Sequence, residues 1–308
     1  MNIYSENKNL ILDGVEDFNI EDILECGQCF NFVKLDNMDY ELVAKGKYLH
    51  ISQRDSVVTM YNTTAADYEN TWKSYFDMET DYTYIKECIL QADGRLADAI
   101  YAKPGIRILR QDFFETLISF IISQNKQIPQ IKQVVKAISE ACGSKIEIKD
   151  RCMFAFPDKE ALKMLSEDRL RQCKVGFRAP YIIDAVNRVC EGSVNEEILS
   201  LKYYESMADM GEADSFAGYT EYVKNKLMEI KGVGEKVASC VMLFGLGIVD
   251  SFPVDVWMKR IMEEMYFNKE TKKEEIESFA LEKFKNVAGY AQQYLFYYGR
   301  EKGIGLKK

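Results

Sequence analysis

Hydrophobic and polar residues alternate over short stretches near the start of the chain, and later stretches follow a helical period. Residues 29–35, 40–45, 47–52 and 56–62 are rich in β-branched and aromatic residues and are separated by polar turns such as D-N-M-D. This pattern predicts strands. Because the turns are short, we expect the strands to pair as an antiparallel meander.

After these strands, apolar residues recur at the spacing of one helix face. The stretch "DFFETLISFIISQ" begins with Asp112 and Glu115, which have the spacing of a capping box. Phe114, Leu117 and Ile121 then fall on one face. Further helices are predicted over residues 128–141, 159–165, 179–191, 219–229, 235–246, 256–266, 272–284 and 288–299.

The predicted fold class is α+β. We expect an antiparallel β-sheet domain with flanking helices over residues 1–108, followed by an all-helical body over residues 109–308. The longest apolar run, residues 237–249, is shorter than the ~20 residues that a membrane span needs. The first residues also lack the basic-then-apolar pattern of a secretion signal. We therefore expect a cytoplasmic protein without membrane contact.

Composition excludes several classes of site. The chain has 308 residues, of which 47% are hydrophobic and 29% charged, as in ordinary globular proteins. The single histidine, His50, cannot build an H-E-x-x-H zinc site, a Ser-His-Asp triad or a histidine-based deaminase site. The eight cysteines are dispersed, so reduced thiols are expected rather than a disulfide framework. The net charge of −9 argues mildly against nucleic acid, but 40 Lys and Arg residues suffice for one local basic patch.

One glycine-rich turn carries a lysine in an unfavourable position. In "EIKGVGEKVASC", residues 229–240, Gly232 and Gly234 form a tight turn between two predicted helices, at about residues 220–246. Lys236 then falls in the first turn of the second helix, where the helix dipole disfavours a cation. Backbone N–H groups at such a turn suit a phosphate. These residues alone support a phosphate-binding hairpin and a plain glycine turn with a solvated lysine equally well.

A second motif follows about twenty residues later. "DSFPVDVWMKRI" places Pro253 two residues before Asp255, which is a natural N-cap for the next helix. A hairpin lysine followed by P-V-D-V resembles the helix–hairpin–helix DNA glycosylases, and a lysine at that position marks the members that are also abasic-site lyases. The resemblance implies that Lys236 is the nucleophile at the sugar C1′ and that Asp255 stabilises the positive charge developing on the sugar or helps to transfer protons.

The placement of the lysine fits this chemistry. An amine must be neutral to attack carbon, and a positive helix end with apolar surroundings favours the neutral form.

Further motifs resemble 8-oxoguanine DNA glycosylases over nearly the whole chain. They are "CGQCFNF", "GIRILRQDFFETLISFIISQNKQI", "VGFRAPYI", "KGVGEKVASC", "FPVDVWM" and "GYAQQYLF". No cysteine follows Cys240, so the four-cysteine iron–sulfur cluster of many superfamily members is not expected, nor is any cofactor.

The resemblance implies a pocket for the flipped base. Cys240 and Phe296 would enclose the base, and Gln292 would hydrogen-bond its Watson–Crick edge. The Gly27 carbonyl would accept the N7–H that 8-oxoguanine has and guanine lacks. From the residues alone, core packing is the favoured explanation of Cys240 and Phe296, and an exposed side chain is the favoured explanation of Gln292. "CGQC" by itself also suggests a redox pair or half a zinc site, although no second C-x-x-C supports a metal.

The resemblance also implies contacts to the complementary strand. Asn125 would fill the space left by the flipped base, Phe177 would insert beside the unpaired partner and Arg178 would contact that partner; otherwise Asn125 is a helix cap. Gln130 takes the place of a second arginine of better-studied members. At the position of Trp257, members of the family often have a histidine that contacts phosphate. We expect the indole N–H of Trp257 to replace that contact, or the contact to be lost.

Carbonyls of the hairpin, those of Met228, Ile230 and Val233, are expected to suit a structural monovalent cation, as in relatives. Catalysis needs no metal. The sequence therefore predicts a monomeric, bifunctional 8-oxoguanine DNA glycosylase and abasic-site lyase that acts on damaged double-stranded DNA. The alternatives are a helix–hairpin–helix glycosylase for another damaged base and a non-catalytic DNA-binding module.

Overall fold

The computed structural model describes residues 1–149, 151–202, 205 and 218–304. The chain packs as two units, which we call unit 1 (Met1–Arg110 with Phe252–Lys308) and unit 2 (Gln111–Ser251). The sequence prediction divided the chain once, near residue 108. In the structure the chain also returns to unit 1 at Phe252, because C-terminal helices pack against N-terminal ones.

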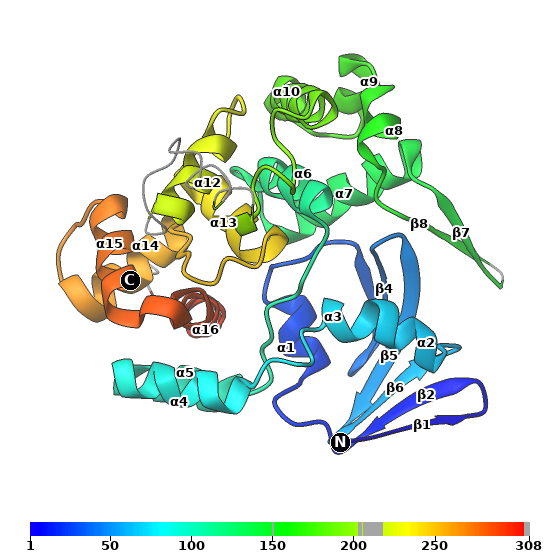
Figure 1. The fold of residues 1–308 in the computed structure, drawn as a ribbon, viewed down its shortest axis with the longest axis horizontal. Coiled ribbons are helices and arrows are strands. Elements are labelled where there is room, and N and C mark those ends of the chain that lie inside the picture. Colours follow the sequence, from blue (N-terminus) through cyan, green and yellow to red (C-terminus); the bar gives the residue numbers. More distant parts are fainter. Residues whose placement is uncertain (150, 203–204, 206–217, 305–308) are drawn as a thin grey trace. The chain divides into compact units, whose positions relative to one another are not determined.

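Unit 1 contains a six-stranded antiparallel sheet with the strand order β1-β2-β6-β5-β4-β3 (Figure 1). The predicted strands correspond to β3–β6, and the α+β fold class is confirmed. The first two strands were not predicted: β1 is exposed along its whole length, and β2 is a short continuous apolar run rather than an alternating one. The strands are β1 (Asn2–Glu6), β2 (Asn9–Asp13), β3 (Phe32–Asp36), β4 (Asp39–Ala44), β5 (Lys47–Arg54) and β6 (Val57–Tyr61).

The core of this sheet fixes the segment that follows helix α1 (Ile20–Glu25). Side chains from β4, β5 and β6 form one buried cluster with Trp72 and Phe76. Ile20, Ile23 and Leu24 of α1 belong to the same cluster. Burial of large apolar side chains stabilises a fold by about 1.5–3 kcal/mol each. The sheet therefore holds α1, and with it the start of the C-G-Q-C segment, in one place.

The helices of unit 1 come from both ends of the chain. Helix α16 packs against α5 and α14, and α15 packs against α4. Short 3-10 or π segments join several of them. The remaining helices are α2 (Ala65–Asp67), α3 (Lys73–Tyr75), α4 (Tyr82–Ala92), α5 (Ala97–Ala102), α14 (Val256–Met262), α15 (Lys273–Phe284) and α16 (Ala288–Lys302).

Unit 2 is mainly helical. Helix α6 packs along α13, and the rings of Phe120 and Phe244 stack with centroids 5.4 Å apart. Asp112 caps α6, as predicted, by accepting the Glu115 N–H at 2.8 Å. Helix α9 and the hairpin of β7 and β8 were not predicted. The elements are α6 (Phe113–Ser123), α7 (Ile128–Cys142), β7 (Lys145–Ile148), β8 (Arg151–Phe154), α8 (Lys159–Lys163), α9 (Glu167–Gln172), α10 (Ala179–Glu191), α12 (Tyr219–Met228) and α13 (Glu235–Gly245).

Within the described ranges, no helix has both the length and the apolar character that crossing a membrane requires.

Candidate active site

The predicted helix–hairpin–helix is present in unit 2 as α12, a glycine turn and α13. Gly232 has a φ of +80°, which disfavours any residue with a side chain. A Cβ at this position would also lie 2.4 Å from the ring of Tyr181, a residue of α10. Gly234 is the N-cap of α13, has an extended backbone and faces open space. Gly232 is thus required by its backbone conformation and by the Tyr181 ring, whereas Gly234 leaves the N-terminus of α13 accessible.

A carboxylate of α10 fixes the start of the turn. Asp184 Oδ2 accepts the Lys231 N–H at 2.8 Å and the Arg188 Nε–H at 3.0 Å. Since Gly234 has no side chain, it cannot cap the first-turn amides of α13, and these donors remain for solvent or a ligand. The hairpin therefore presents donors for a phosphate.

Lys236 lies in the first turn of α13 and is partly buried. Its Nζ donates a hydrogen bond to Ser123 Oγ at 3.1 Å and lies 5.1 Å from the centroid of the Phe120 ring. Both partners belong to the last turns of α6. The amine is therefore held in a defined position by one hydroxyl and one ring.

The chain turns sharply after α6 at Asn125, which was predicted to contact the complementary DNA strand. Asn125 is exposed and has a φ of +52°, a left-handed conformation that asparagine tolerates well. Arg178 is almost completely buried and donates hydrogen bonds to the carbonyls of Gln124 and, at 3.0 Å, Val175. Burial lowers the pKa of the Arg178 guanidinium. Its guanidinium contacts protein carbonyls beside Asn125.

Phe177 is one of the few large apolar side chains left exposed. Half of its surface is accessible, and its ring lies edge-on to Tyr181 with centroids 6.1 Å apart. The Arg178 guanidinium lies 4.3 Å from the centroid of the same ring. Tyr181 thus contacts both Phe177 and the glycine turn.

Cys240 is buried, one turn further along α13 than Lys236. The hairpin carbonyl of Ile230 accepts the Val233 N–H at 3.0 Å, and Met228 ends α12. The three carbonyls that were expected to suit a cation thus lie at the end of α12 and in the turn that follows it.

The remaining predicted residues belong to unit 1. Asp255 caps α14, as predicted, and its Oδ1 accepts the Met258 N–H at 2.7 Å. Trp257 is partly exposed, and the Arg260 guanidinium lies 6.0 Å from its ring centroid. One face of the Asp255 carboxylate is thus committed to the helix N-terminus.

The C-G-Q-C segment is a loop in which both cysteines and the glutamine are buried. Gly27 has a φ of +92°. Cys26 is fully buried and its thiol donates to the Ile23 carbonyl, and burial raises the pKa of this thiol to about 11. Gln28 is also buried; its Nε2 donates to the carbonyls of Ile23 at 2.9 Å and Arg107 at 2.7 Å. Among the residues that the structure describes, no group of three or more potential ligands could hold a metal ion.

Helix α16 carries two of the four predicted base-binding residues, Gln292 and Phe296. Gln292 is buried, its Nε2 donates to the Pro253 carbonyl at 3.3 Å, and its Oε1 has no hydrogen-bond partner among the described residues. Phe296 is partly exposed. Gln292 is therefore not the exposed side chain that its sequence context also allowed, and it keeps one acceptor available.

Several residues that build these settings were not singled out from the sequence: Ser123, Tyr181, Asp184, Gln28 and Arg300. Ser123 and Tyr181 lie inside quoted motifs, so their positions were visible although their contacts were not. Arg300 lies beyond the last motif, and only the packing of α16 on the Gly27 segment identifies it.

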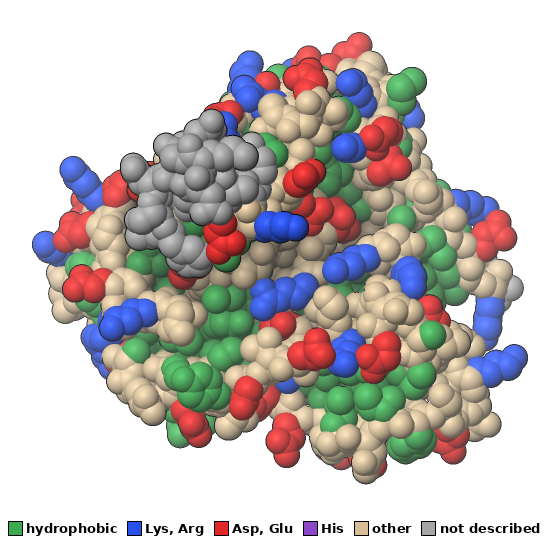
Figure 2. All heavy atoms as spheres, viewed as in Figure 1, with side chains coloured by type: hydrophobic (Ala, Val, Ile, Leu, Met, Phe, Trp, Pro, Cys, Tyr) green, Lys and Arg blue, Asp and Glu red, His purple; other side chains and the backbone are tan. Residues whose placement is uncertain are grey.

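Surface charge is compatible with a local anion-binding site. Basic and acidic side chains are interspersed over the face drawn in Figure 2, so this face is not uniformly acidic despite the net charge of −9. Lys231 is exposed in the hairpin itself.

The chain is similar to known base excision DNA repair proteins. Residues 10–117 match the family model of the 8-oxoguanine DNA glycosylase N-terminal domain, and residues 118–286 match that of the HhH-GPD superfamily of base excision DNA repair proteins. A probable N-glycosylase/DNA lyase of Methanothermobacter thermautotrophicus is 27% identical over 74% of this chain and 72% of its own length.

Two solved structures are similar over almost the full length. MBOgg1 in complex with a low-affinity DNA ligand is 40% identical with a TM-score of 0.89, covering 98% of this chain and 99% of that one. The Clostridium acetobutylicum 8-oxoguanine glycosylase/lyase, in complex with DNA containing cytosine opposite 8-oxoG, is 38% identical with a TM-score of 0.88, covering 99% of each chain. The chain therefore belongs to the HhH-GPD superfamily of base excision DNA repair proteins and, within it, to the 8-oxoguanine DNA glycosylase/lyases.

Proposed function

We propose that this protein removes 8-oxoguanine from double-stranded DNA with Lys236 as the nucleophile and then cleaves the abasic site. The observation that carries the proposal is the position of the Lys236 amine, in the first turn of the second hairpin helix and 3.1 Å from Ser123 Oγ. The Lys236 nitrogen forms a bond to C1′ while the glycosidic C1′–N9 bond breaks, and the base leaves with that electron pair and takes up a proton.

The second step uses the bond formed in the first. The sugar ring opens as C1′–O4′ breaks, O4′ takes a proton, and the C1′–nitrogen bond becomes a Schiff base. Loss of a proton from C2′ then expels the 3′ phosphate by β-elimination, and water later releases Lys236. A single amine thus explains both the glycosylase and the lyase activity.

Asp255 is assigned to the positive charge that develops on the sugar. Its carboxylate accepts a hydrogen bond from the Met258 N–H, which holds the side chain in one orientation and leaves other lone pairs available. A fixed carboxylate stabilises a developing cation without the cost of reorganisation.

Base recognition is assigned to Gly27, Gln292, Cys240 and Phe296. The unpaired Gln292 Oε1 supports a contact to donors of the Watson–Crick edge, since a buried acceptor without a partner is costly until a ligand supplies one. The Gly27 carbonyl accepts the N7–H of 8-oxoguanine, whereas guanine would place a lone pair against it. Cys240 and Phe296 contact the two faces of the flipped base.

DNA positioning is assigned to the hairpin glycines, Gly232 and Gly234, and to Trp257, through backbone phosphates. Asn125 fills the space of the flipped base and Phe177, with half its surface exposed, inserts beside the orphaned partner. Because Arg178 is almost completely buried, its guanidinium must become accessible when DNA binds in order to contact that partner. We also propose that the protein acts as a cytoplasmic monomer.

Product analysis on a panel of duplexes tests this function. Single-turnover incubation with duplexes containing 8-oxoguanine, 3-methyladenine, uracil or no lesion should release free base and a β-elimination product from the 8-oxoguanine duplex. Faster release of another damaged base would favour the rival glycosylase. Tight binding with no base release from any duplex would favour a non-catalytic binding module.

A further inference from the structure

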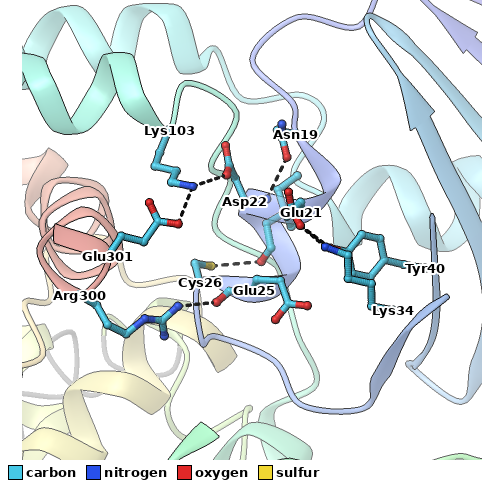
Figure 3. A network of polar contacts seen from close by, with 11 residues as sticks. Asn19, Glu21, Asp22, Glu25, Cys26, Lys34, Tyr40, Lys103, Arg300 and Glu301 are labelled. Atoms are coloured by element: carbon cyan, nitrogen blue, oxygen red, sulfur yellow. Dashed lines mark hydrogen bonds and ion pairs between the residues drawn. The ribbon is translucent and has the colours of Figure 1, made fainter. Parts of the chain in front are cut away.

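One side chain of helix α16 contacts both the Gly27 segment and the Phe296 ring. Arg300 Nη2 donates a hydrogen bond to the Glu25 carbonyl at 2.8 Å, which lies two residues before Gly27 (Figure 3). The same guanidinium lies 5.7 Å from the centroid of the Phe296 ring and 5.2 Å from that of Tyr297. Arg300 thus joins two elements to which base recognition is assigned.

The Gly27 segment depends on such long-range contacts. Gln293, also of α16, donates a hydrogen bond to the Cys26 carbonyl at 3.4 Å. Gly27 has a positive φ, a conformation that glycine adopts without steric cost. Two adjacent carbonyls before Gly27 are therefore held by one helix. The direction of the Gly27 carbonyl follows from how these two peptides are fixed.

The guanidinium is held at some cost. Arg300 Nη1 is buried and has no hydrogen-bond partner among the described residues. A buried donor left without a partner destabilises a fold, whereas an apolar side chain of similar length would fill the same space without that cost. The rigid, planar fork of arginine is what allows one side chain to bind a carbonyl and lie on a ring together.

We propose that Arg300 is a positioning residue for recognition of the oxidised base. By fixing the Glu25 carbonyl and the Phe296 ring to one another, it sets the Gly27 carbonyl at the distance from the stacked base that the N7–H requires. The proposal rests on the assigned roles of Gly27 and Phe296. Arg300 acts through these residues and does not itself contact the reacting atoms.

The outer part of the same network provides a matched control. Lys103 pairs with Asp22 at 3.3 Å and with Glu301 at 2.9 Å, and its ammonium lies 4.4 Å from the Tyr297 ring (Figure 3). Glu301 is exposed and neighbours Arg300 on α16. Glu301→Gln removes an ion pair between α16 and Lys103, the residue that ends α5, and leaves the contacts of Arg300 to Phe296 and Glu25 in place.

Two reactions of one enzyme separate positioning of the base from general damage to the fold. Wild type, Arg300→Met, Arg300→Lys and Glu301→Gln are compared in single-turnover excision of 8-oxoguanine and in cleavage of a duplex that already contains an abasic site. An abasic site carries no base to recognise. We expect Arg300→Met to lower excision by roughly ten- to a hundredfold, the effect of a displacement of about 1 Å, while abasic-site cleavage is unchanged.

The control and the lysine variant complete the test. We expect Glu301→Gln to match wild type in both reactions, and Arg300→Lys to show the excision defect as well, because lysine keeps the charge but lacks the fork. If Arg300→Met does not fold, as judged by its melting curve, Arg300→Lys carries the comparison. Excision at the wild-type rate, or an equal loss in both reactions, would overturn the proposal. Wild type that does not release 8-oxoguanine would instead refute the proposed function.

Discussion

The hairpin of unit 2 and the Gly27 segment of unit 1 are held in place by different kinds of contact. The hairpin is fixed by its own two helices and by Tyr181 and Asp184 of α10, fewer than sixty residues earlier in the chain. The Gly27 segment is fixed by Gln293 and Arg300, which are separated from their partners by 267 and 275 residues. A segment such as the hairpin can be recognised from a local motif, whereas the position of the Gly27 segment depends on how helices distant in sequence pack.

Removing the charge of Asp255, a residue of unit 1, should strongly slow excision of the base. Asp255→Asn keeps a good N-cap for α14, since asparagine caps helices about as well as aspartate. We therefore expect an unchanged melting temperature and single-turnover excision slower by roughly a hundredfold or more, as when one electrostatic stabiliser is lost. Asp255→Ala, which also removes the cap, should lower both. Wild-type rates for Asp255→Asn would reject its role at the developing charge.

Introducing an arginine at position 130, in unit 2, should alter selectivity for the base opposite the lesion. Gln130 is exposed and accepts the Gln127 N–H at 3.1 Å through Oε1, so it caps α7 and offers no guanidinium to the opposite cytosine. A second arginine would contribute about 1–3 kcal/mol of discrimination in favour of cytosine, and wild type lacks that contact. We therefore expect wild-type excision rates opposite the four bases to differ by less than about tenfold. Gln130→Arg should widen this spread.

Gln130→Ala separates that effect from loss of the cap. It should leave the spread as in wild type while removing the Oε1 acceptor. A thousandfold preference of wild type for cytosine would contradict this prediction and would mean that another residue replaces the missing arginine.

The two hairpin glycines should respond differently to alanine. Gly232→Ala imposes a left-handed backbone, which costs about 1–2 kcal/mol, and its Cβ would also meet the Tyr181 ring at 2.4 Å. We expect a lower melting temperature and weaker binding to a damaged duplex. Gly234→Ala, with a φ of −104° and open space around the Cβ, should leave stability unchanged. Equal melting temperatures for both variants would show that the Tyr181 contact does not constrain the turn.

The smallest effect concerns the reactivity of two thiols, Cys26 of unit 1 and Cys152 of unit 2. Burial raises the pKa of Cys26 to about 11, so this thiol stays protonated at neutral pH and, being inaccessible, should resist alkylation. Cys152 is exposed and should be modified by iodoacetamide first. Mass spectrometry of the native protein distinguishes the two, with the unfolded protein as the control. Early modification of Cys26 would reopen the redox interpretation of C-G-Q-C.

Much of the fold, but less of the site, was predictable from the sequence. The β3–β6 meander, the cap of α6 and the cap of α14 follow from local patterns and are confirmed. Strands β1 and β2 and the β7–β8 hairpin were missed. Strand β1 is exposed throughout and β7 and β8 are only partly buried, so these three have no clear hydrophobic face, whereas β2 is a short continuous apolar run without alternation.

The Lys236 hairpin could be recognised because its glycines, lysine and following P-V-D-V are close in sequence. No local pattern, however, shows that Ser123 contacts Lys236 across 113 residues, or that Gln292 is buried with an unpaired oxygen. Such contacts depend on helix packing, which periodicity does not determine. The roles of Gly27 and Gln292 were therefore expected only by resemblance, and they stay predictions.

Trapping of the covalent intermediate tests the central claim most directly. Wild-type protein is incubated with an 8-oxoguanine duplex and sodium borohydride, which reduces a Schiff base to a stable adduct, and the adduct is digested and mapped by mass spectrometry. We predict one DNA-linked peptide, modified at Lys236, and no adduct with Lys236→Gln, although this variant should still bind the damaged duplex. An adduct at Lys231 or another amine, or base release at the wild-type rate by Lys236→Gln, would contradict the account.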